Sequence, residues 1–407
     1  MSELRRKIAQ RVPAISWRDK KLRDLDGRLA KNQKKRAALS AELNAAKQEL
    51  AAQKGDLNAV DAQLGALQQQ RDSLEDSVKA ERRRRRAPSF EALLSSYAAQ
   101  HQAALQLSNR DLSPMAQIPF KLRNYSLAQS HGVTAPEIYG VWRSAREVDL
   151  SVVDADRVVL KGDGGHSAQG VFPLERTADG WRTVDGEIGF AGDLLPEDLQ
   201  KTLGKARSPF FAEQFLVSPS GWTIPEDVKL YCAYGEVLQV YVMRSSADSS
   251  MDRKTFSSRF FDASGAPLDE IRTGLNYDHS IDAPQHLPEL VEAARHLSRA
   301  VGMPFMRVDM YSTAAGPVLG ELTAVPSAGV QSYATRHDRA MGKAWVEAQA
   351  RLEHDLMRGR PFGTLYGSHE YTWWYPEARD KDNMHRPDNW HRRQASCGEW
   401  CFTSPQA

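Results

Sequence analysis

Residues 303–326, MPFMRVDMYSTAAGPVLGELTAVP, form two apolar runs on either side of a short Ala-Ala-Gly turn. This pattern predicts two antiparallel strands. Side chains alternate along a strand, so Arg307 and Asp309 share one face of the first run, and Glu321 and Thr323 share one face of the second. A three-residue loop centred on the second alanine pairs Asp309 with Glu321 and Arg307 with Thr323. Two carboxylates and an arginine then converge on one patch.

This patch has the chemistry of a metal and phosphate site. Mg²⁺ prefers oxygen ligands, binds through one or two carboxylates and completes its shell with phosphate and water. A permanently charged arginine beside the metal suits charge that develops on a phosphoryl or tetrahedral oxygen. The alternative is a salt-bridge ladder across an exposed hairpin. The apolar neighbours favour a covered sheet, in which unpaired carboxylates need a ligand.

A second candidate for phosphate binding is VVLKGDGGHSAQGVFPL, residues 158–174. A Walker A loop carries its lysine after the glycines and opens a helix, whereas Lys161 precedes the glycines and the loop returns to a strand. A Rossmann fingerprint also leads into a helix. The remaining design is a strand–glycine loop–strand flap, in which Lys161 and backbone N–H groups hold phosphates. An ordinary glycine-rich hairpin turn is the alternative.

The pattern after residue 90 is that of a mixed helix and sheet protein. Apolar periodicity and turn residues predict three helices and two further strand regions, over 90–107, 120–131, 287–302, 210–217 and 228–244. Asp227 and Lys229 share one face of the last region. With Arg253 and Lys254 in the polar stretch SSADSSMDRKTF, they are either site residues or exposed charges.

A heptad ladder precedes this region. No proline occurs between Pro13 and Pro88. Within this stretch, two sets of positions repeat every seven residues, and apolar residues fill most of them. The apolar residues are Leu22, Leu29, Leu43, Leu50, Leu57, Leu64 and Val78 in the first set and Leu25, Leu39, Ala46, Val60, Leu67 and Leu74 in the second. A stripe repeating every 3.5 residues for this length predicts a coiled coil and self-association, giving a homo-oligomer. Gly55 allows an antiparallel helical hairpin instead, although the heptad phase passes through it unshifted.

Bulk composition limits the partners. Lysine and arginine number 54 against 52 acidic residues, so net charge does not indicate nucleic acid. The arginine run 82–86 could contact anionic lipid, giving weak membrane-surface contact, or simply complement the dipole of a helix end. Three cysteines and no apolar run of spanning length predict a soluble cytoplasmic protein without a disulfide framework. Cys397 and Cys401 with His385 and His391 have poor spacing for a zinc finger, so we expect no metal there.

The order Lys161 with GDGGHSAQG, then AEQFL, then RVDMY, then GELTAVPSAG resembles the ATP-grasp superfamily over about residues 115–335. It is most similar to the TupA-like group, which is associated with teichuronic acid and other surface polysaccharides, and more distantly similar to D-alanine–D-alanine ligases. The resemblance implies an α+β ATP-grasp fold, with two lobes gripping ATP, behind a long N-terminal coiled-coil helix.

The resemblance also implies roles for single residues. Lys161 would contact the α and β phosphates, and Lys121 and Lys229 would face the nucleotide. Arg307 would stabilise the transferring charge, and Arg253 would meet the γ-phosphate or an acidic substrate. The loop over the triphosphate would include Gly164, Gly165, His166 and Ser167, and the adenine-binding hinge would be Glu213, Gln214, Phe215 and Leu216. Asp309 and Glu321 would hold Mg²⁺ with Thr323, which stands where D-alanine ligases carry Asn.

The function implied is an ATP-dependent carboxylate–amine ligase that forms an amide through an acyl phosphate and releases ADP and phosphate. Its substrate would be a cell-surface polysaccharide precursor or a related metabolite. The alternatives are a sugar or metabolite kinase on the same fold and a non-catalytic nucleotide-binding scaffold. We expect a division into an N-terminal segment, a coiled coil, the start of the ATP-grasp module, a glycine-loop lobe, a metal-binding lobe and a Trp/His/Arg-rich tail, at 1–18, 19–87, 88–155, 156–220, 221–345 and 346–407.

Overall fold

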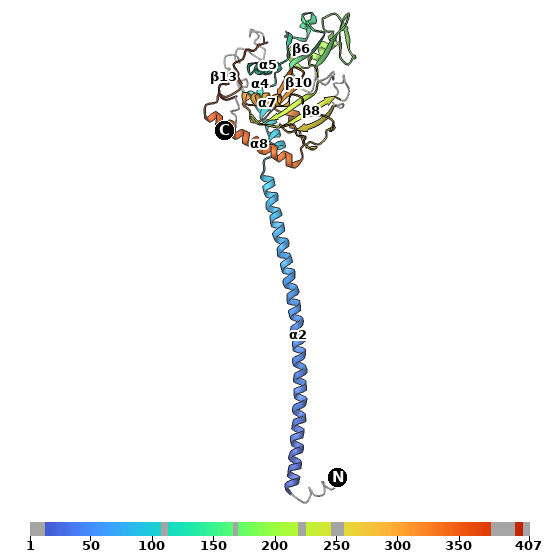
Figure 1. Ribbon diagram of the computed structural model, residues 1–407, viewed down its shortest axis with the longest axis vertical. Helices are drawn as coiled ribbons and strands as arrows, with labels where there is room; N and C mark the ends of the chain where they lie inside the picture. Colours follow the sequence, from blue (N-terminus) through green and yellow to red (C-terminus); the bar gives the residue numbers. More distant parts are fainter. Residues whose placement is uncertain are drawn as a thin grey trace. The chain divides into compact units, whose positions relative to one another are not determined.

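The computed structural model describes residues 13–106, 113–165, 170–218, 225–245, 256–375 and 395–401. The chain divides into two compact units, Met1–Arg86 and Ala87–Ala407. Figure 1 shows the first unit as a helix and the second as a mixed helix and sheet unit. In the described part of the chain, none of the helices combines the length and the apolar composition that a bilayer span requires.

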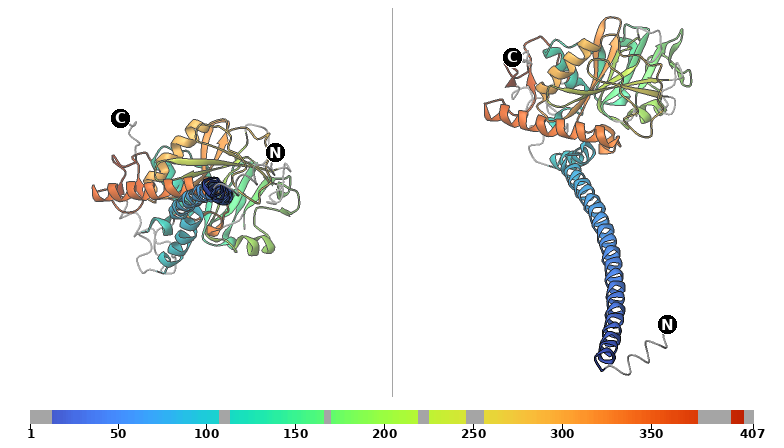
Figure 2. Two further views of the ribbon diagram at one scale, coloured as in Figure 1. Left: turned by 90° about the horizontal axis from the view of Figure 1, so that it is seen from below. Right: turned by 60° about the horizontal axis from the view of Figure 1, so that its bottom comes forward.

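The described part of the first unit is one helix, α2 (Pro13–Arg86), of 74 residues. Its range includes Gly55, and Figures 1 and 2 show it as a single unbroken helix, so the helical hairpin is not what this chain forms. At 1.5 Å per residue α2 is about 110 Å long. The leucines and valines of the heptad ladder are exposed along it, from 50% at Leu25 to 64% at Leu39. The side chains of residues 83–86 lie outside the described part.

The second unit contains a six-stranded antiparallel sheet in the order β1-β6-β2-β3-β4-β5. Its strands are β1 (Ile138–Trp142), β2 (Arg157–Gly164), β3 (Phe172–Arg176), β4 (Gly180–Thr183), β5 (Gly189–Ala191) and β6 (Arg207–Gln214). Helix α6 (Glu197–Leu203) buries Leu199 and Leu203 in the same core as Trp181. Strands β2 and β3 pair on either side of the glycine-rich stretch, as the strand–loop–strand design predicts.

A five-stranded antiparallel sheet follows, in the order β11-β10-β7-β8-β9. Its strands are β7 (Asp227–Cys232), β8 (Val237–Ser245), β9 (Phe256–Phe261), β10 (Met306–Thr313) and β11 (Gly316–Thr323). Helix α7 (Leu287–Val301) packs on β7 and β10 through a buried apolar stripe and ends at Gly302, which has the left-handed conformation typical of a helix stop.

Helix α5 (Lys121–Ser130) connects the two sheets, because it contacts β2 of the first and β11 of the second. Residues 122–128 are all buried, polar ones included. The remaining elements are α3 (Phe90–Ala104), α4 (Pro114–Gln117), α8 (Thr335–Met357), the short strands β12 (Leu365–Tyr366) and β13 (Ala395–Ser396), and the 3₁₀ turns η2 (Ala145–Glu147), η3 (Leu150–Val152) and η5 (Pro326–Gly329). Helix α8 runs through the expected domain boundary at residue 345.

The hairpin of β10 and β11 has the predicted pairs, Asp309 with Glu321 and Arg307 with Thr323, but not the predicted loop. Thr313 pairs with Gly316, so the turn holds two residues and not three. The register shifts by one residue after Asp309, at a β-bulge beside Gly320. The extra residue therefore lies in the strand, next to the carboxylates, and not in the turn.

Phe90 at the start of α3 is the centre of an aromatic core. It is fully buried, and its ring lies 5.1 Å from Phe305, 5.6 Å from Tyr333 and 5.6 Å from Trp345, between ring centroids. These partners come from the segment before β10, the segment before α8 and α8 itself. The core of the second unit is thus centred on Phe90, which lies near the start of that unit in sequence.

We expect Phe90→Ala to lower the free energy of unfolding of the second unit by about 3–5 kcal/mol, because it leaves a cavity among three rings. Urea unfolding followed by tryptophan fluorescence measures this change. Phe362→Ala is the matched control, since Phe362 is 72% exposed and its loss should change little. Equal effects of the two substitutions would contradict the assignment of Phe90 to the core.

Candidate nucleotide and metal site

Lys161 in β2 is buried and has bonds to two partners. Its Nζ forms an ion pair with Glu213 of β6 and donates to the Tyr125 hydroxyl of α5 at 3.1 Å. The Tyr125 hydroxyl in turn donates to Glu213 Oε2 at 2.8 Å. Burial lowers the pKa of Lys161, and Glu213 only partly offsets this effect. A cation whose charged form is disfavoured in this way gains from the approach of further negative charge.

Asp163 is a site residue that the sequence did not single out. It is fully buried two residues after Lys161; its Oδ1 accepts from the backbone N–H of Leu122 at 2.8 Å, and its Oδ2 accepts from the Tyr375 hydroxyl. Burial raises the pKa of this carboxyl. Asp163 therefore fastens the strand that carries Lys161 to the first turn of α5.

Arg307, Asp309 and Lys229 form the second buried cluster. Arg307 donates through Nε to Asp309 Oδ1 and through a terminal nitrogen to Oδ2, both at 2.5 Å. Lys229 Nζ donates to Asp309 Oδ2 at 2.8 Å and to Asp227 Oδ2 at 2.5 Å. Arg307 also donates to the Thr323 hydroxyl at 3.3 Å. Strands β7, β10 and β11 each supply residues, so the cross-strand register creates this cluster.

The charges of this cluster support one another. Burial acts to raise the pKa of Asp309, but Arg307 and Lys229 outweigh it and hold that pKa below its usual value. Burial acts to lower the pKa of Lys229, but Asp227 and Asp309 raise it above the usual value. Asp309 is therefore an anion at neutral pH, although only 4% of the residue is exposed.

Glu321 joins the two clusters. Its Oε2 lies 3.3 Å from Lys121 Nζ at the start of α5, and its Oε1 lies 3.8 Å from Arg307. The Glu321 side chain is 36% exposed, whereas that of Asp309 is 5% exposed. Helix α5 thus links two charged groups, which together we call the charged band. It contains four cations and four carboxylates, namely Lys121, Lys161, Lys229 and Arg307 with Glu213, Asp227, Asp309 and the exposed Glu321.

The oxygen atoms of this band fit Mg²⁺. Asp309 accepts three hydrogen bonds, and a carboxylate offers about four lone-pair sites, so one remains. Glu321 is open to solvent, and the Thr323 hydroxyl is an oxygen acceptor on the same face. Hard oxygen donors with an open side are the set that Mg²⁺ takes beside phosphate and water.

Of the predicted loop and hinge residues that the structure describes, Glu213 belongs to the band through its bond to Lys161, and the others lie around it. Gly164 is buried in β2 against Arg207, and Gly165 is exposed after it. Glu213 and Gln214 end β6, Phe215 stacks under Arg157 at 5.5 Å, and Leu216 is half-buried in the following loop. The predicted residues His166, Ser167 and Arg253 lie outside the described residues, as do Lys254, His385 and His391.

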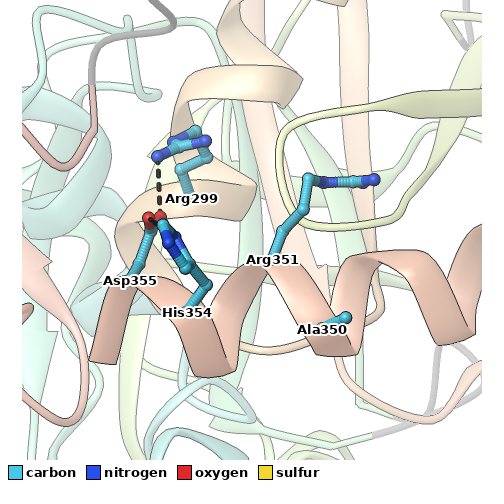
Figure 3. Close-up of a pocket in the computed structure, with 5 residues that line it drawn as sticks. All are labelled: Arg299, Ala350, Arg351, His354 and Asp355. Carbon is cyan, nitrogen blue, oxygen red and sulfur yellow. Dashed lines mark hydrogen bonds and ion pairs between the residues drawn. The ribbon is translucent and has the colours of Figure 1, made fainter. Parts of the chain in front are cut away.

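A cavity of about 430 Å³ lies elsewhere, between α7 and α8 (Figure 3). It is lined by Arg299, Ala350, Arg351, His354 and Asp355, and holds none of the predicted site residues. Asp355 binds Arg299 at 3.0 Å and accepts from Tyr234 at 2.7 Å. The bond to Arg299 joins α8 to α7, and the bond to Tyr234 joins α8 to the turn after β7. The charged side chains of this cavity thus serve packing contacts, and the charged band remains the candidate site.

Residues 211–346 match the family model of TupA-like ATP-grasp proteins. Over these residues the chain is similar to TupA-like ATP-grasp proteins. ATP and Mg²⁺ are the cofactors of ATP-grasp ligases, which in general join a carboxylate to an amine. The matched segment begins in β6 and ends in α8, so it contains the cluster of Arg307, Asp309 and Lys229 but neither Lys121 nor Lys161.

The solved structures to which the chain is similar are ATP-grasp proteins with low sequence identity. The D-alanine–D-alanine ligase of Bacillus anthracis is 15% identical, with a TM-score of 0.39 over 60% of this chain and 70% of that one. The VanG D-Ala:D-Ser ligase of Enterococcus faecalis is 14% identical, with a TM-score of 0.39 over 59% of this chain and 63% of that one. A RimK domain ATP-grasp protein of Sphaerobacter thermophilus is 13% identical, with a TM-score of 0.33 over 57% of this chain and 68% of that one. No curated protein matches the chain.

A double-mutant cycle tests the buried pair of Lys161 and Glu213. We expect Lys161→Met and Glu213→Gln each to lower the free energy of unfolding by about 3–5 kcal/mol, because each leaves a buried charge unpaired. The double variant should lose less than the sum of the two, by on the order of 0.5–3 kcal/mol in denaturant unfolding.

The exposed pair of Lys201 and Glu197, 3.0 Å apart on α6, is the control. The same substitutions there should add with no measurable coupling, since exposed ion pairs contribute little. Full additivity at Lys161 and Glu213 would show that the two groups do not share a buried contact.

Proposed function

We propose that the chain is an ATP-dependent carboxylate–amine ligase that acts in the cytoplasm on a cell-surface polysaccharide precursor or a related metabolite. The observation that carries the proposal is the pairing of Asp309 with Glu321, beside Arg307, within the ATP-grasp match. A buried anion, an open carboxylate and a fixed guanidinium on one sheet face are the parts that phosphoryl transfer needs.

Lys161 and Lys121 are proposed to bind the phosphates of ATP. Lys161 forms an ion pair with Glu213, and Lys121 forms one with Glu321. These ion pairs fix the positions of the two ammonium groups before the nucleotide binds. Phosphate oxygens are acceptors that can replace carboxylate oxygens at an ammonium group without leaving it unpaired. Lys229, fixed by Asp227 and Asp309, keeps its charge and supports the same region.

Asp309 and Glu321, with Thr323, are proposed to hold Mg²⁺. Bound there, Mg²⁺ neutralises charge on the phosphates and orients them. Arg307 keeps the Asp309 carboxylate in one orientation through two hydrogen bonds. It also donates to the Thr323 hydroxyl and lies 3.8 Å from Glu321. A guanidinium fixed in this way is preorganised for negative charge that develops during transfer.

The proposed reaction has two balanced steps. A substrate carboxylate oxygen forms a bond to the γ-phosphorus of ATP while the bond to the bridging oxygen breaks, giving an acyl phosphate and ADP. An amine then attacks the acyl carbon, the carbon–oxygen bond to phosphate breaks, and the amine loses a proton, giving an amide and phosphate. The flap between β2 and β3 would keep water from the acyl phosphate.

Incubation with Mg-ATP, a panel of uronic acids and a panel of amines tests the activity, with substrate-dependent ADP as the expected product. Hydroxylamine added in place of the amine should yield a hydroxamate, since it captures an acyl phosphate. ADP without hydroxamate would indicate a sugar or metabolite kinase instead. AMP as product would contradict the acyl-phosphate route, and ATP binding without turnover across the panels would favour a nucleotide-binding scaffold.

Lys161→Ala should lower kcat for ADP formation by about 100- to 1000-fold, because a preorganised cation in a buried site is lost. Lys201→Ala is the matched control, since Lys201 is 65% exposed on α6 and should keep full activity. Circular dichroism of both variants confirms that the fold is retained. A fully active and folded Lys161→Ala variant would rule out a phosphate-binding role for Lys161.

Self-association through α2 is the second part of the proposal, so that the active protein is a homo-oligomer with a coiled coil. The exposed leucines and valines of α2 follow a seven-residue repeat, and a single helix cannot bury them. Each leucine that a partner helix covers contributes about 1.5–3 kcal/mol. A seam of this length therefore supports a stable assembly.

We expect Leu43→Asp with Leu50→Asp in the full chain to lower the mass measured by light scattering toward that of one chain, because two charges enter the seam. The control is Ala45→Asp with Ala52→Asp, which adds the same charges to the same turns of α2 but off the seam. The control should keep the mass of the unaltered protein. If neither pair of substitutions changes the mass, α2 is not the association surface.

A further inference from the structure

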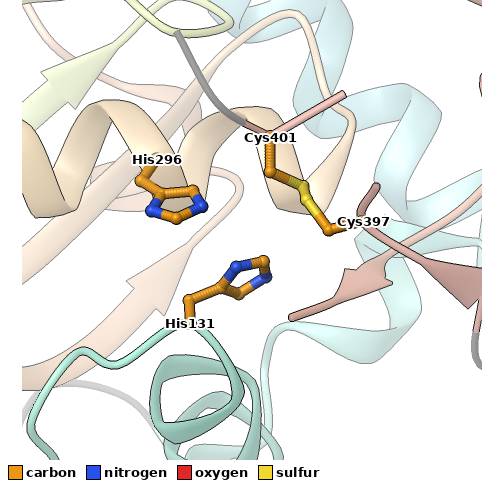
Figure 4. A group of neighbouring side chains, drawn as sticks. All are labelled: His131, His296, Cys397 and Cys401. Carbon is orange, nitrogen blue, oxygen red and sulfur yellow. A yellow bond between two sulfur atoms is a disulfide. The ribbon is translucent and has the colours of Figure 1, made fainter. Parts of the chain in front are cut away.

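Away from the nucleotide site, two histidines and two cysteines meet at one point (Figure 4). They are His131, His296, Cys397 and Cys401, and their ligand atoms all lie within 4.8 Å of one another. We propose that the reduced chain binds one Zn²⁺ between these four side chains. Two thiolates and two imidazoles are a common tetrahedral set for structural zinc.

The four residues come from three separate parts of the fold. His131 is the residue that ends α5, His296 lies on α7, and the cysteines flank a tight turn after β13. Figure 4 shows the two imidazole rings next to each other beside the two sulfur atoms; the ring centroids are 4.6 Å apart and the rings are tilted edge to face. No local motif joins these positions, which is why the sequence, in which only His385 and His391 lie near the two cysteines, did not predict a metal site.

The hydrogen bond of His131 prepares one ring nitrogen as a ligand. Its Nε2 lies 3.0 Å from the carbonyl oxygen of Leu365 in β12. A carbonyl oxygen only accepts, so Nε2 carries the hydrogen, and Nδ1 of the neutral ring has the free lone pair. A ring N–H given to a backbone carbonyl is the usual second contact of a zinc-bound histidine, since it fixes tautomer and orientation.

The cysteine segment is held in place by bonds that do not involve sulfur. The backbone N–H of Cys397 donates to Tyr366 at 2.8 Å, that of Trp400 donates to Cys397 at 3.0 Å, and Arg299 Nε donates to the Trp400 carbonyl at 2.8 Å. Cys401 is fully buried, Cys397 is 3% exposed and His131 is 7% exposed. The ligand atoms are therefore presented together in an enclosed place, as a structural zinc site requires.

The structure joins Cys397 and Cys401 as a disulfide. A zinc site needs the same two sulfurs as thiolates, so metal binding to the reduced chain breaks two S–H bonds and releases two protons to solvent. Disulfide and zinc site are therefore alternative states of one cysteine pair, and only one can be present in a given chain. Which state the chain holds can be measured directly.

The position of the cluster gives the metal a structural role in the ATP-grasp domain. Helix α5 carries Lys121 at its first residue and His131 directly after its last. Zinc bound at His131 would fix the far end of this helix to α7 and to the C-terminal segment, about 15 Å from Lys121. Its sulfur and nitrogen ligands also differ in kind from the oxygen ligands that Mg²⁺ prefers.

Metal analysis and native mass spectrometry of the full chain, purified under reducing conditions with added Zn²⁺, test the proposal. We expect one Zn²⁺ per chain, and with Co²⁺ in its place the thiolate charge-transfer and tetrahedral d–d bands. Cys397→Ala and His296→Asn should each weaken Zn²⁺ binding by at least about 10- to 100-fold. 1,10-Phenanthroline removes Zn²⁺ but leaves Mg²⁺. It should lower the melting temperature of the unaltered chain and leave the melting temperatures of the Cys397→Ala and His296→Asn variants unchanged.

Cys232→Ala is the matched control, because Cys232 is a buried cysteine in β7 outside the cluster and its loss should leave one Zn²⁺ per chain. The Co²⁺ spectrum needs no variant, so it decides the question even if a substituted chain fails to fold. No bound metal, with only one of the three thiols titrating after denaturation without reductant, would overturn the proposal in favour of the disulfide. Zinc bound equally well by Cys397→Ala would overturn it too.

Discussion

The β-bulge beside Gly320 decides which side chains form the candidate site. Near the turn, Thr313 pairs with Gly316 and Met310 with Leu319. Continued without a bulge, this register would set Glu321 opposite Val308 and so on the apolar face of the sheet. The one-residue shift returns Glu321 and Thr323 to the face of Asp309 and Arg307. Glycine suits this place, because a Cβ at residue 320 would approach the Tyr311 ring to 2.9 Å.

Helix α5 transmits this arrangement to the other sheet. Lys121 at its first residue binds Glu321 of β11, and Tyr125, one turn later, binds both Lys161 and Glu213. Asp163 then holds the first turn of the same helix through Leu122. The two lobes therefore meet through charge-assisted hydrogen bonds to one buried helix, which fixes their lysines and carboxylates relative to one another.

The strands and the charged pairs were predictable because they follow local rules. Alternation placed Arg307 with Asp309 on one face, and the resemblance of motifs identified Lys161 and Lys121. The loop length was wrong, yet the pairs at the site were right, because the bulge supplies the residue that the turn lacks. Tyr125, Asp163 and the histidine–cysteine cluster were not predictable, since their partners lie far apart in sequence and only tertiary packing brings them together.

The two lysines facing the proposed phosphates differ in how readily they can exchange partners. Glu213 is 6% exposed at its side chain, and the Tyr125 hydroxyl also binds it, so separating it from Lys161 leaves one charge in a dry environment. Glu321 is 36% exposed, and water can replace Lys121 at its oxygens at little cost. The pair of Lys121 and Glu321 is therefore the easier of the two to separate. The pair of Lys161 and Glu213 is the harder one to separate, so it holds β2 and β6 together at their buried face.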